Sequence, residues 1–148
     1  MSETKMRGEW FITLYGQDGE IKEKRQGHNV VTTVGKEYVA SFLYSAAVAA
    51  STFTGYYIGI GSTDTAEAVG DTALGTELSR QTGTASYISG QIYQVTATFA
   101  TGSGTGAIVE YGLFSSSTGG TLIARDTESA INKGANDVLT VVAQFTFS

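Results

Sequence analysis

The sequence predicts a mainly β fold: an antiparallel β-sandwich of jelly-roll-like type, with an N-terminal hairpin and one packed helix. Nineteen glycines and many threonines and serines favour strands and turns over helices. After residue 80, short segments with strand character alternate with glycine-rich turns, a spacing typical of sandwiches and barrels. A chain of 148 residues is expected to form one β domain, 1–148.

The N-terminal part is predicted to form a loose arm followed by a hairpin. Residues 1–8 are polar and are expected to be a flexible arm. The hairpin covers 9–26, and the aromatic and branched residues of 9–15 predict its first strand. Asp18-Gly19 predicts its turn, because both residue types tolerate positive φ.

The returning strand of this hairpin is strongly charged, and two interpretations stay open. Residues 20–25 read Glu-Ile-Lys-Glu-Lys-Arg, a composition typical of an exposed edge strand that is guarded against aggregation. Alternatively, this strand docks on a partner by charge complementarity or strand addition. The predicted partner-contact residues are then Glu20, Lys22, Lys24 and Arg25.

One helix is predicted over 33–50. Apolar residues recur at helical spacing in two adjacent rows: Val34, Tyr38, Phe42 and Ala46, and Val39, Leu43 and Ala47. Thr33 is expected to cap the N-terminus, and Glu37 is expected to interact favourably with the helix dipole. The apolar stripe predicts that the helix packs on the sheet.

The stretch from Tyr56 to Arg80 is predicted to be the long connection into the main β body, 55–148. It opens with a short apolar strand and continues as an acidic loop that contains Asp64, Glu67 and Asp71. These carboxylates are interpreted as solvated. A calcium site built with backbone carbonyls is the alternative, although the spacing is not that of an EF-hand.

The rest of the chain is interpreted as strands and turns. Segments 91–100 and 138–147 alternate apolar and polar residues most clearly. Further strands are expected at 81–89, 107–114 and 121–127, with turns at 101–106 and within 129–137.

Composition argues against several classes of function. The chain has no cysteine, so disulfides and thiol chemistry are excluded. Its net charge of −5 argues against a nucleic-acid partner. The longest weakly polar run, 39–50, is too short to span a bilayer, and the N-terminus lacks the apolar core of a signal peptide. We therefore expect no membrane partner, and a product that stays in the cytoplasm until it meets a partner.

No catalytic motif is visible. His28 is the sole imidazole, and it is interpreted as a hydrogen-bonding structural residue rather than a ligand or catalytic base. Gly59-Ile60-Gly61 lacks the third glycine and the following helix of a dinucleotide fingerprint. The tyrosines are interpreted as sheet residues, with a sugar-binding face as the alternative. We therefore predict that the protein is not an enzyme and uses no cofactor or metal.

Five short segments, taken in order, carry a resemblance: Asn29–Gly35, Ile58–Thr65, Asp71–Arg80, Glu110–Phe114 and Ile131–Gly134. Their arrangement resembles that of small structural proteins of tailed-bacteriophage virions. Such proteins serve as capsid decoration (cement) proteins or as parts of tails and fibres. The resemblance extends from Asn29 to the C-terminus and does not include the charged hairpin.

The resemblance implies a protein that decorates and stabilises the capsid by binding the lattice of the major capsid protein. The alternative that it implies is a tail or tail-fibre component with a receptor-recognition role. The expected partners are the major capsid protein or another virion protein, together with further copies of the chain as a dimer or trimer. The expected location is the virion, assembled in the host cytoplasm. A small enzyme or a carbohydrate-binding domain is the third possibility.

Overall fold

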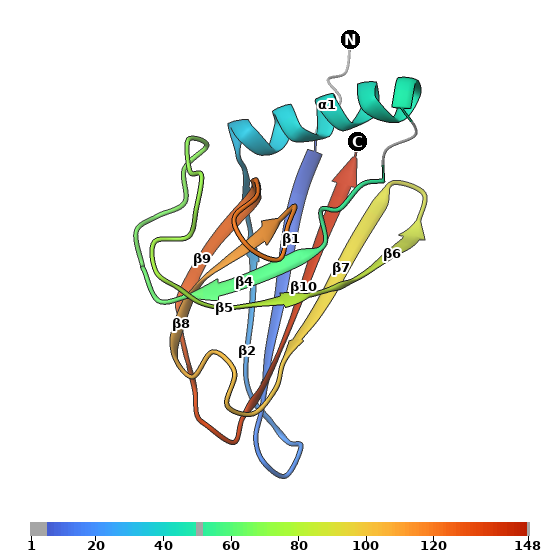
Figure 1. Ribbon diagram of the computed structural model, residues 1–148. Coiled ribbons are helices and arrows are strands. Elements are labelled where there is room, and N and C mark those ends of the chain that lie inside the picture. Colours follow the sequence, from blue (N-terminus) through green and yellow to red (C-terminus); the bar gives the residue numbers. More distant parts are fainter. Residues whose placement is uncertain (1–5, 50–51, 148) are drawn as a thin grey trace.

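Two antiparallel five-stranded sheets and one helix make up the structure, a computed structural model that describes residues 6–49 and 52–147 (Figure 1). Sheet A has the strand order β2-β1-β10-β7-β6, and sheet B has the order β3-β9-β8-β4-β5. The two sheets pack face to face, which confirms the predicted mainly β, sandwich-like fold. The jelly-roll pattern of connections stays a prediction.

The elements have the following bounds: β1 (Met6–Tyr15), β2 (Ile21–His28), β3 (Val30–Val31), α1 (Thr33–Ala49), β4 (Tyr57–Gly61), β5 (Glu77–Thr82), β6 (Thr84–Ser89), β7 (Ile92–Phe99), β8 (Gly106–Phe114), β9 (Leu122–Lys133) and β10 (Val138–Phe147). Within the described residues, no helix is long and apolar enough to cross a membrane.

The core lies between the sheets and follows from the period of two in the strands. In β1, the buried side chains are Trp10, Ile12 and Leu14, and the intervening residues point away from the core. The same alternation buries Val141 and Phe145 in β10, which pairs with β1 along its whole length. Burial of each such side chain contributes about 1.5–3 kcal/mol, so this shared layer is a main source of stability.

The N-terminal segment is more ordered than the sequence predicts. β1 and β2 form the expected hairpin, with Gly19 at a φ of 83° in its turn. Residues 6–8, expected to belong to the flexible arm 1–8, are the first residues of β1, because they pair with the end of β10. Residues 1–5 lie outside the described part of the chain.

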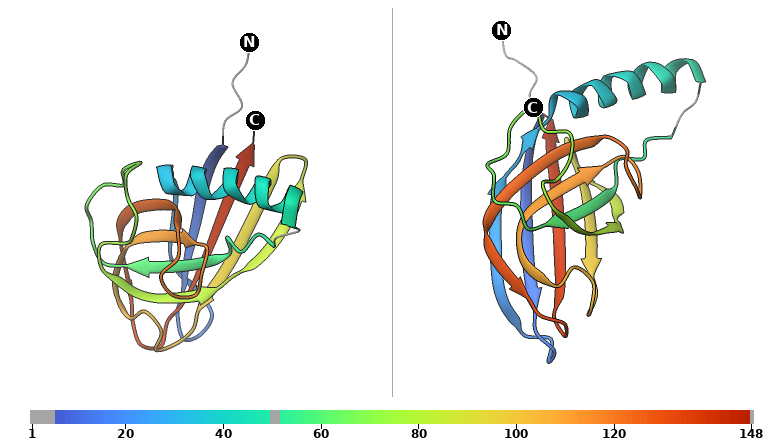
Figure 2. Two further views of the ribbon diagram at one scale, coloured as in Figure 1. Left: turned by 45° about the horizontal axis from the view of Figure 1, so that its top comes forward. Right: turned by 60° about the vertical axis from the view of Figure 1, so that its left-hand side comes forward.

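The helix matches the predicted range 33–50 up to Ala49, and residue 50 lies outside the described residues. Its N-terminal cap is Thr32, not Thr33: the buried Thr32 hydroxyl oxygen accepts a hydrogen bond from the Gly35 N–H at 2.9 Å. Glu37 lies beyond the first turn, so it does not contribute the expected dipole interaction. Figure 2 shows that α1 lies across the end of the sandwich rather than along the face of a sheet.

Two contacts hold the helix to this end. Near its start, Gly35 lies against the backbone of Ile123 in β9. Further along, the Phe53 ring packs on Phe42 of α1 at 5.2 Å and on Tyr93 of β7 at 5.7 Å between ring centroids. The segment that follows the helix therefore joins it to sheet A.

We expect the substitution Gly35→Ala to lower the free energy of unfolding by about 1–3 kcal/mol, because it overpacks a rigid contact. A Cβ atom at Gly35 would lie 2.7 Å from the Cα atom of Ile123, and backbone atoms cannot move aside as a side-chain tip can. Gly70→Ala is the matched control, because nothing lies within 4 Å of its added Cβ. Urea unfolding followed by Trp10 fluorescence measures both. Equal stabilities for the two variants would contradict the predicted contact.

Several boundaries differ from the predicted ones. The polar segment Glu77–Thr82 is a strand, β5, and Gly83 separates it from β6. β5 is the edge strand of sheet B and β6 is the edge strand of sheet A, so this stretch of chain passes from one sheet to the other. Gly83 donates its N–H to Tyr56 O at 2.8 Å, and a side chain there would meet Val95. Asn132 and Lys133, expected in a turn, continue β9 because they pair with the start of β8.

Candidate functional site

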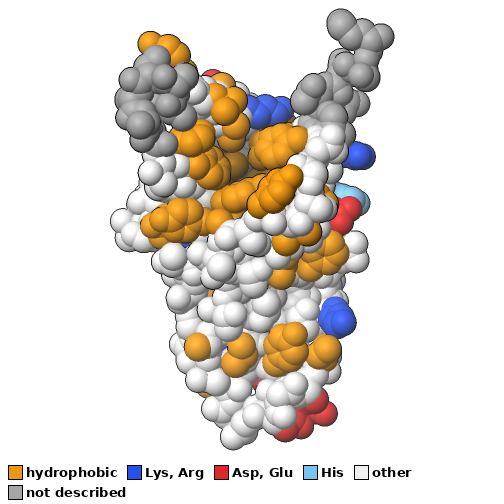
Figure 3. All heavy atoms as spheres, turned by 90° about the vertical axis from the view of Figure 1, so that its right-hand side faces the viewer, with side chains coloured by type: hydrophobic (Ala, Val, Ile, Leu, Met, Phe, Trp, Pro, Cys, Tyr) orange, Lys and Arg blue, Asp and Glu red, His pale blue; other side chains and the backbone are white. Residues whose placement is uncertain are grey.

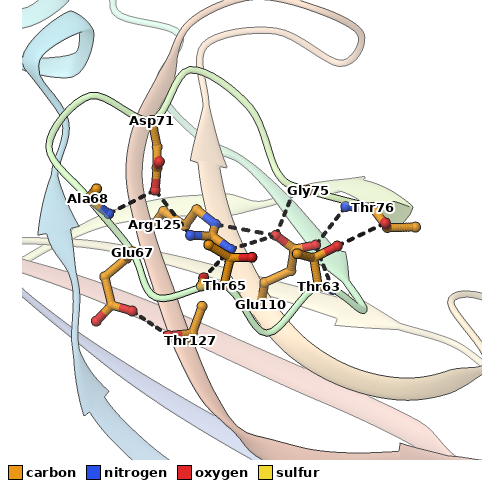
Figure 4. A network of polar contacts seen from close by, with 10 residues as sticks. All are labelled: Thr63, Thr65, Glu67, Ala68, Asp71, Gly75, Thr76, Glu110, Arg125 and Thr127. Carbon is orange, nitrogen blue, oxygen red and sulfur yellow. Dashed lines mark hydrogen bonds and ion pairs between the residues drawn. The ribbon is translucent and has the colours of Figure 1, made fainter.

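A buried ion pair on the outer face of sheet B fixes the long connection between β4 and β5 (Figure 4). Glu110 of β8 and Arg125 of β9 are joined by an Nη2–Oε1 contact of 3.1 Å, and their side chains are 0% and 3% exposed. Glu110 is the one charged residue in the otherwise apolar run of β8, whereas Arg125 marks the end of the apolar start of β9 and is followed directly by Asp126.

The Glu110 carboxylate accepts hydrogen bonds from three backbone N–H groups of the connection between β4 and β5. Thr63 and Thr76 donate to Oε2 at 3.0 and 2.8 Å, and Gly75 donates to Oε1 at 2.8 Å. Burial acts to raise the pKa of Glu110, but the three backbone donors and Arg125 outweigh it and hold the pKa below its ordinary value. Glu110 is therefore a charged anchor for the connection.

Arg125 binds the more distant part of the same connection. Its Nη1 lies 3.0 Å from Asp71 Oδ2, and its Nη2 donates to Thr65 O at 2.9 Å. The Glu67 carboxylate accepts a hydrogen bond from Thr127 on β9. Two of the three acids expected to be solvated thus bind sheet B, and Asp64 remains exposed.

These contacts give the connection a structural role. Leu74 packs with Phe114 and Leu122 in a second, smaller apolar cluster, which covers the outer face of sheet B. Within residues 6–49 and 52–147, no group of three or more His, Cys, Asp or Glu side chains is arranged to hold a metal ion.

The charged strand β2 lies at an edge of sheet A, as the sequence predicts. Of the four predicted partner-contact residues, Glu20 in the turn before β2 and Lys22 and Lys24 within it are exposed. Lys22 Nζ lies 3.2 Å from Asp137 Oδ2, in the turn before β10. Docking through this strand stays a prediction, and Lys22 would have to exchange an internal partner for an external one.

Arg25, the fourth predicted contact residue, joins β2 to an irregular part of β9. Between two paired positions, β8 advances two residues, from Ile108 to Glu110, while β9 advances four, from Thr127 to Ile131. Arg25 donates to Ser129 Oγ at 2.8 Å within this bulge. The Arg25 side chain thus closes the sandwich on the side of β2.

The sole histidine does not have the role expected of it. His28 is exposed, and its Nδ1 lies 4.0 Å from Glu9 Oε1, beyond hydrogen-bonding distance. It therefore does not act as a hydrogen-bonding structural residue. Its neighbours do not form a nucleophile–base pair with it, so it also gives no support to a catalytic centre.

A groove with an entirely apolar lining opens between α1 and the strand ends of sheet A, with a volume of about 490 Å³. Val39, Phe42 and Leu43 of α1 form one wall, while Tyr93, Phe145 and Phe147 of β7 and β10 lie opposite. Four further apolar residues come from β1, β8, β9 and the segment after the helix. Figure 3 shows hydrophobic side chains gathered around this hollow.

The sequence predicts only part of this groove. The three helical residues belong to the predicted apolar stripe, which was expected to pack on the sheet. In the structure Leu43 is 64% exposed, so the stripe is only partly covered by the protein itself. The other walls come from segments far apart in the chain, and no local pattern brings them together.

The sequence also does not predict the buried acid on the inner face of sheet B. Asp126 is 1% exposed, and neither of its carboxylate oxygens has a hydrogen-bond partner among the described residues. Burial, followed by repulsion from Glu128 and Glu67, raises the pKa of Asp126 to about 8. Burial beside a second acid therefore favours the protonated, uncharged form of Asp126.

Comparisons with protein-family models, with curated proteins and with solved structures find no match to this chain. The function is therefore inferred from the residues themselves. The polar anchors are engaged within the fold, whereas the described residues leave the apolar groove uncovered.

Proposed function

We propose that this protein is a structural component of a tailed-bacteriophage virion, which decorates and stabilises the capsid by binding the lattice of the major capsid protein. Two lines of argument support the proposal. The order of the five segments from Asn29 to Gly134 resembles that of such proteins. The groove beneath α1 supplies a surface on which an apolar segment of a partner can be buried.

The open groove is the observation that carries the proposal. Its exposed lining is apolar, and the Tyr93 hydroxyl donates to Gly55 O at 2.8 Å. The groove therefore suits an aliphatic or aromatic segment of another protein better than a sugar, which requires hydrogen-bonding groups. This chemistry favours a capsid-binding role over recognition of a cell-surface sugar by a tail fibre. Burial of one large apolar side chain contributes about 1.5–3 kcal/mol.

Such contacts can be individually weak in a lattice. A decoration protein binds many equivalent sites, and neighbouring copies can support one another, so overall attachment exceeds the affinity of one groove. The acidic net charge of −5 helps to keep the free protein soluble before it binds. A stiff sandwich loses little conformational freedom on docking, which also favours binding.

The test is to add the purified protein to capsids assembled without it and to image the particles by electron cryo-microscopy. We expect saturable occupancy at symmetric positions. Leu43→Asp should weaken binding at least about tenfold, because it places a charge in the apolar groove. Ile21→Asp is the matched control: Ile21 is 52% exposed, lies on β2, and does not line the groove.

Two outcomes would separate the parts of this proposal. Binding to tails or host cells without binding to capsids would overturn the capsid role and favour the tail or tail-fibre alternative. Capsid binding that Leu43→Asp leaves unchanged would exclude the groove, and Lys24→Glu would then test the exposed part of the charged strand.

A further inference from the structure

The two edge strands of sheet A differ sharply in composition. An edge strand presents backbone N–H and C=O groups to any strand that approaches, and charged side chains normally block such pairing. The β2 edge carries four charges in the run from Lys22 to Arg25. The β6 edge, Thr84–Ser89, carries no charged residue and no proline. Charges guard the first edge, whereas the β6 edge is interrupted only by a bulge at Ile88, where β6 advances two residues from Tyr87 to Ser89 and β7 advances one.

The β6 edge also exposes large apolar side chains. Tyr87 is 74% exposed and Ile88 is 47% exposed. β6 pairs with β7 on one side, and on its other side it has no strand partner within the described part of the chain. An uncharged edge with exposed Tyr and Ile is the pattern that favours addition of another strand.

The register of sheet A connects this edge with the groove. Tyr87 lies opposite Tyr93, and Tyr93 lies opposite Phe145, so the three side chains share one face of the sheet. Phe145 is fully buried in the core, Tyr93 is partly buried, and Tyr87 projects beyond the cover of sheet B. Figure 3 views this side of the molecule and shows hydrophobic side chains on its surface.

We propose that β6 pairs antiparallel with β6 of a second copy of this chain, so that sheet A continues across a two-fold axis. Antiparallel pairing of a strand with itself is self-complementary, as a two-fold dimer requires. Like charges oppose self-association of a chain with a net charge of −5. The uncharged β6 edge avoids this repulsion where two copies meet, and Tyr87 and Ile88 add apolar contact.

This inference concerns the free protein, and it goes beyond the proposed capsid role. Its test needs no capsid, so its failure leaves the capsid proposal standing, and failure of capsid binding leaves the dimer standing. The capsid test changes Leu43 in the groove, whereas the dimer test changes the β6 edge.

The first experiment is sedimentation of the full chain over a range of concentrations. We expect the wild type to form dimers, and Ile88→Lys to weaken dimerisation at least about tenfold, because it adds a charge to the pairing edge. Ile21→Lys is the matched control, since it makes the same change at similar exposure on the opposite edge, and it should dimerise as the wild type does. Trp10 fluorescence verifies that each variant is folded.

The second experiment uses the absence of cysteine from the chain. Under mild oxidation, Ser86→Cys, in the middle of β6, should form a covalent dimer, whereas Gln26→Cys, exposed on β2, should not. A wild type that is monomeric at every concentration would overturn the proposal. So would a dimer that Ile88→Lys leaves intact, or equal cross-linking through the two cysteines.

Discussion

Replacing Glu110 with glutamine should lower the free energy of unfolding by about 3–5 kcal/mol, the cost of breaking a buried ion pair by removing one partner. Glu110 accepts hydrogen bonds at both carboxylate oxygens, from Thr63 and Thr76 at one and from Gly75 and Arg125 at the other. Glutamine offers one oxygen and one NH₂ group, so in either orientation its amide faces donors that it cannot satisfy.

Glu110→Gln should reduce local stability more in the connection between β4 and β5 than in the core. Amide hydrogen exchange should show a loss of protection at Thr63, Gly75 and Thr76, whose N–H groups bind Glu110. Urea unfolding measures the global change. Glu20→Gln is the matched control, because Glu20 lies exposed in the β1–β2 turn and its change should stay within about 0.5 kcal/mol. A loss below about 1 kcal/mol for Glu110→Gln would show that this ion pair does not hold the connection.

Three of the segments on which the proposed virion role rests meet at the Glu110 carboxylate. Thr63 belongs to Ile58–Thr65, Gly75 and Thr76 belong to Asp71–Arg80, and Glu110 begins Glu110–Phe114. Three of the five segments therefore meet at one buried charge.

The fold class could be predicted because burial of one face leaves a period of two in the sequence. In β10, Leu139, Val141 and Phe145 are buried as the alternation predicts, and β7 follows the same rule. β5 was missed because an edge strand does not need apolar residues. The strand β3, Val30–Val31, is too short to leave a pattern.

The sites were harder to predict because they depend on contacts between distant segments. The single charge of Glu110 inside the apolar run of β8 is the sequence signal for the buried pair, and it shows neither its partner Arg125 nor the connection that the pair binds. Lys133 likewise depends on a distant segment, because its side chain is buried and Nζ donates to Ala100 O at 2.9 Å. Asn132 and Lys133, which have the composition of a turn, therefore continue strand β9.

The buried acid Asp126 should make the stability of the protein depend on pH. It is enclosed by the bulge in β9 and by Gly27 of β2. Asp126 lies opposite Tyr111 across the β8–β9 pair and points into the sandwich. A Cβ atom at Gly27 would overlap Glu128 Oε1 and would lie 3.0 Å from Asp126 Oδ2. Strand β2 thus approaches closely only because residue 27 has no side chain. It covers Asp126 and Glu128, and ionisation of Asp126 would place a second negative charge beside Glu128.

We expect the stability of the wild type to fall as pH rises from about 5.5 to about 8. The pKa of Asp126 is raised to about 8 in the folded protein, against about 3.9 in an unfolded chain, so between these values the folded state holds a proton that the unfolded state releases. The free energy of unfolding should therefore fall by up to about 1.4 kcal/mol per pH unit, and the contribution is fully present only below the unfolded pKa.

Asp126→Asn should remove most of this slope and raise stability at pH 8, because asparagine fills the same space without a proton to lose. Asp64→Asn is the control, since Asp64 is exposed in the connection and its replacement should leave the slope as it is. Urea unfolding at several pH values above about 5.5 avoids the range in which Glu110 and Asp137, whose pKa values are lowered, take up protons. If the Asp126→Asn and wild-type curves run parallel, the buried acid does not govern how β2 is held, and another group must account for any pH dependence.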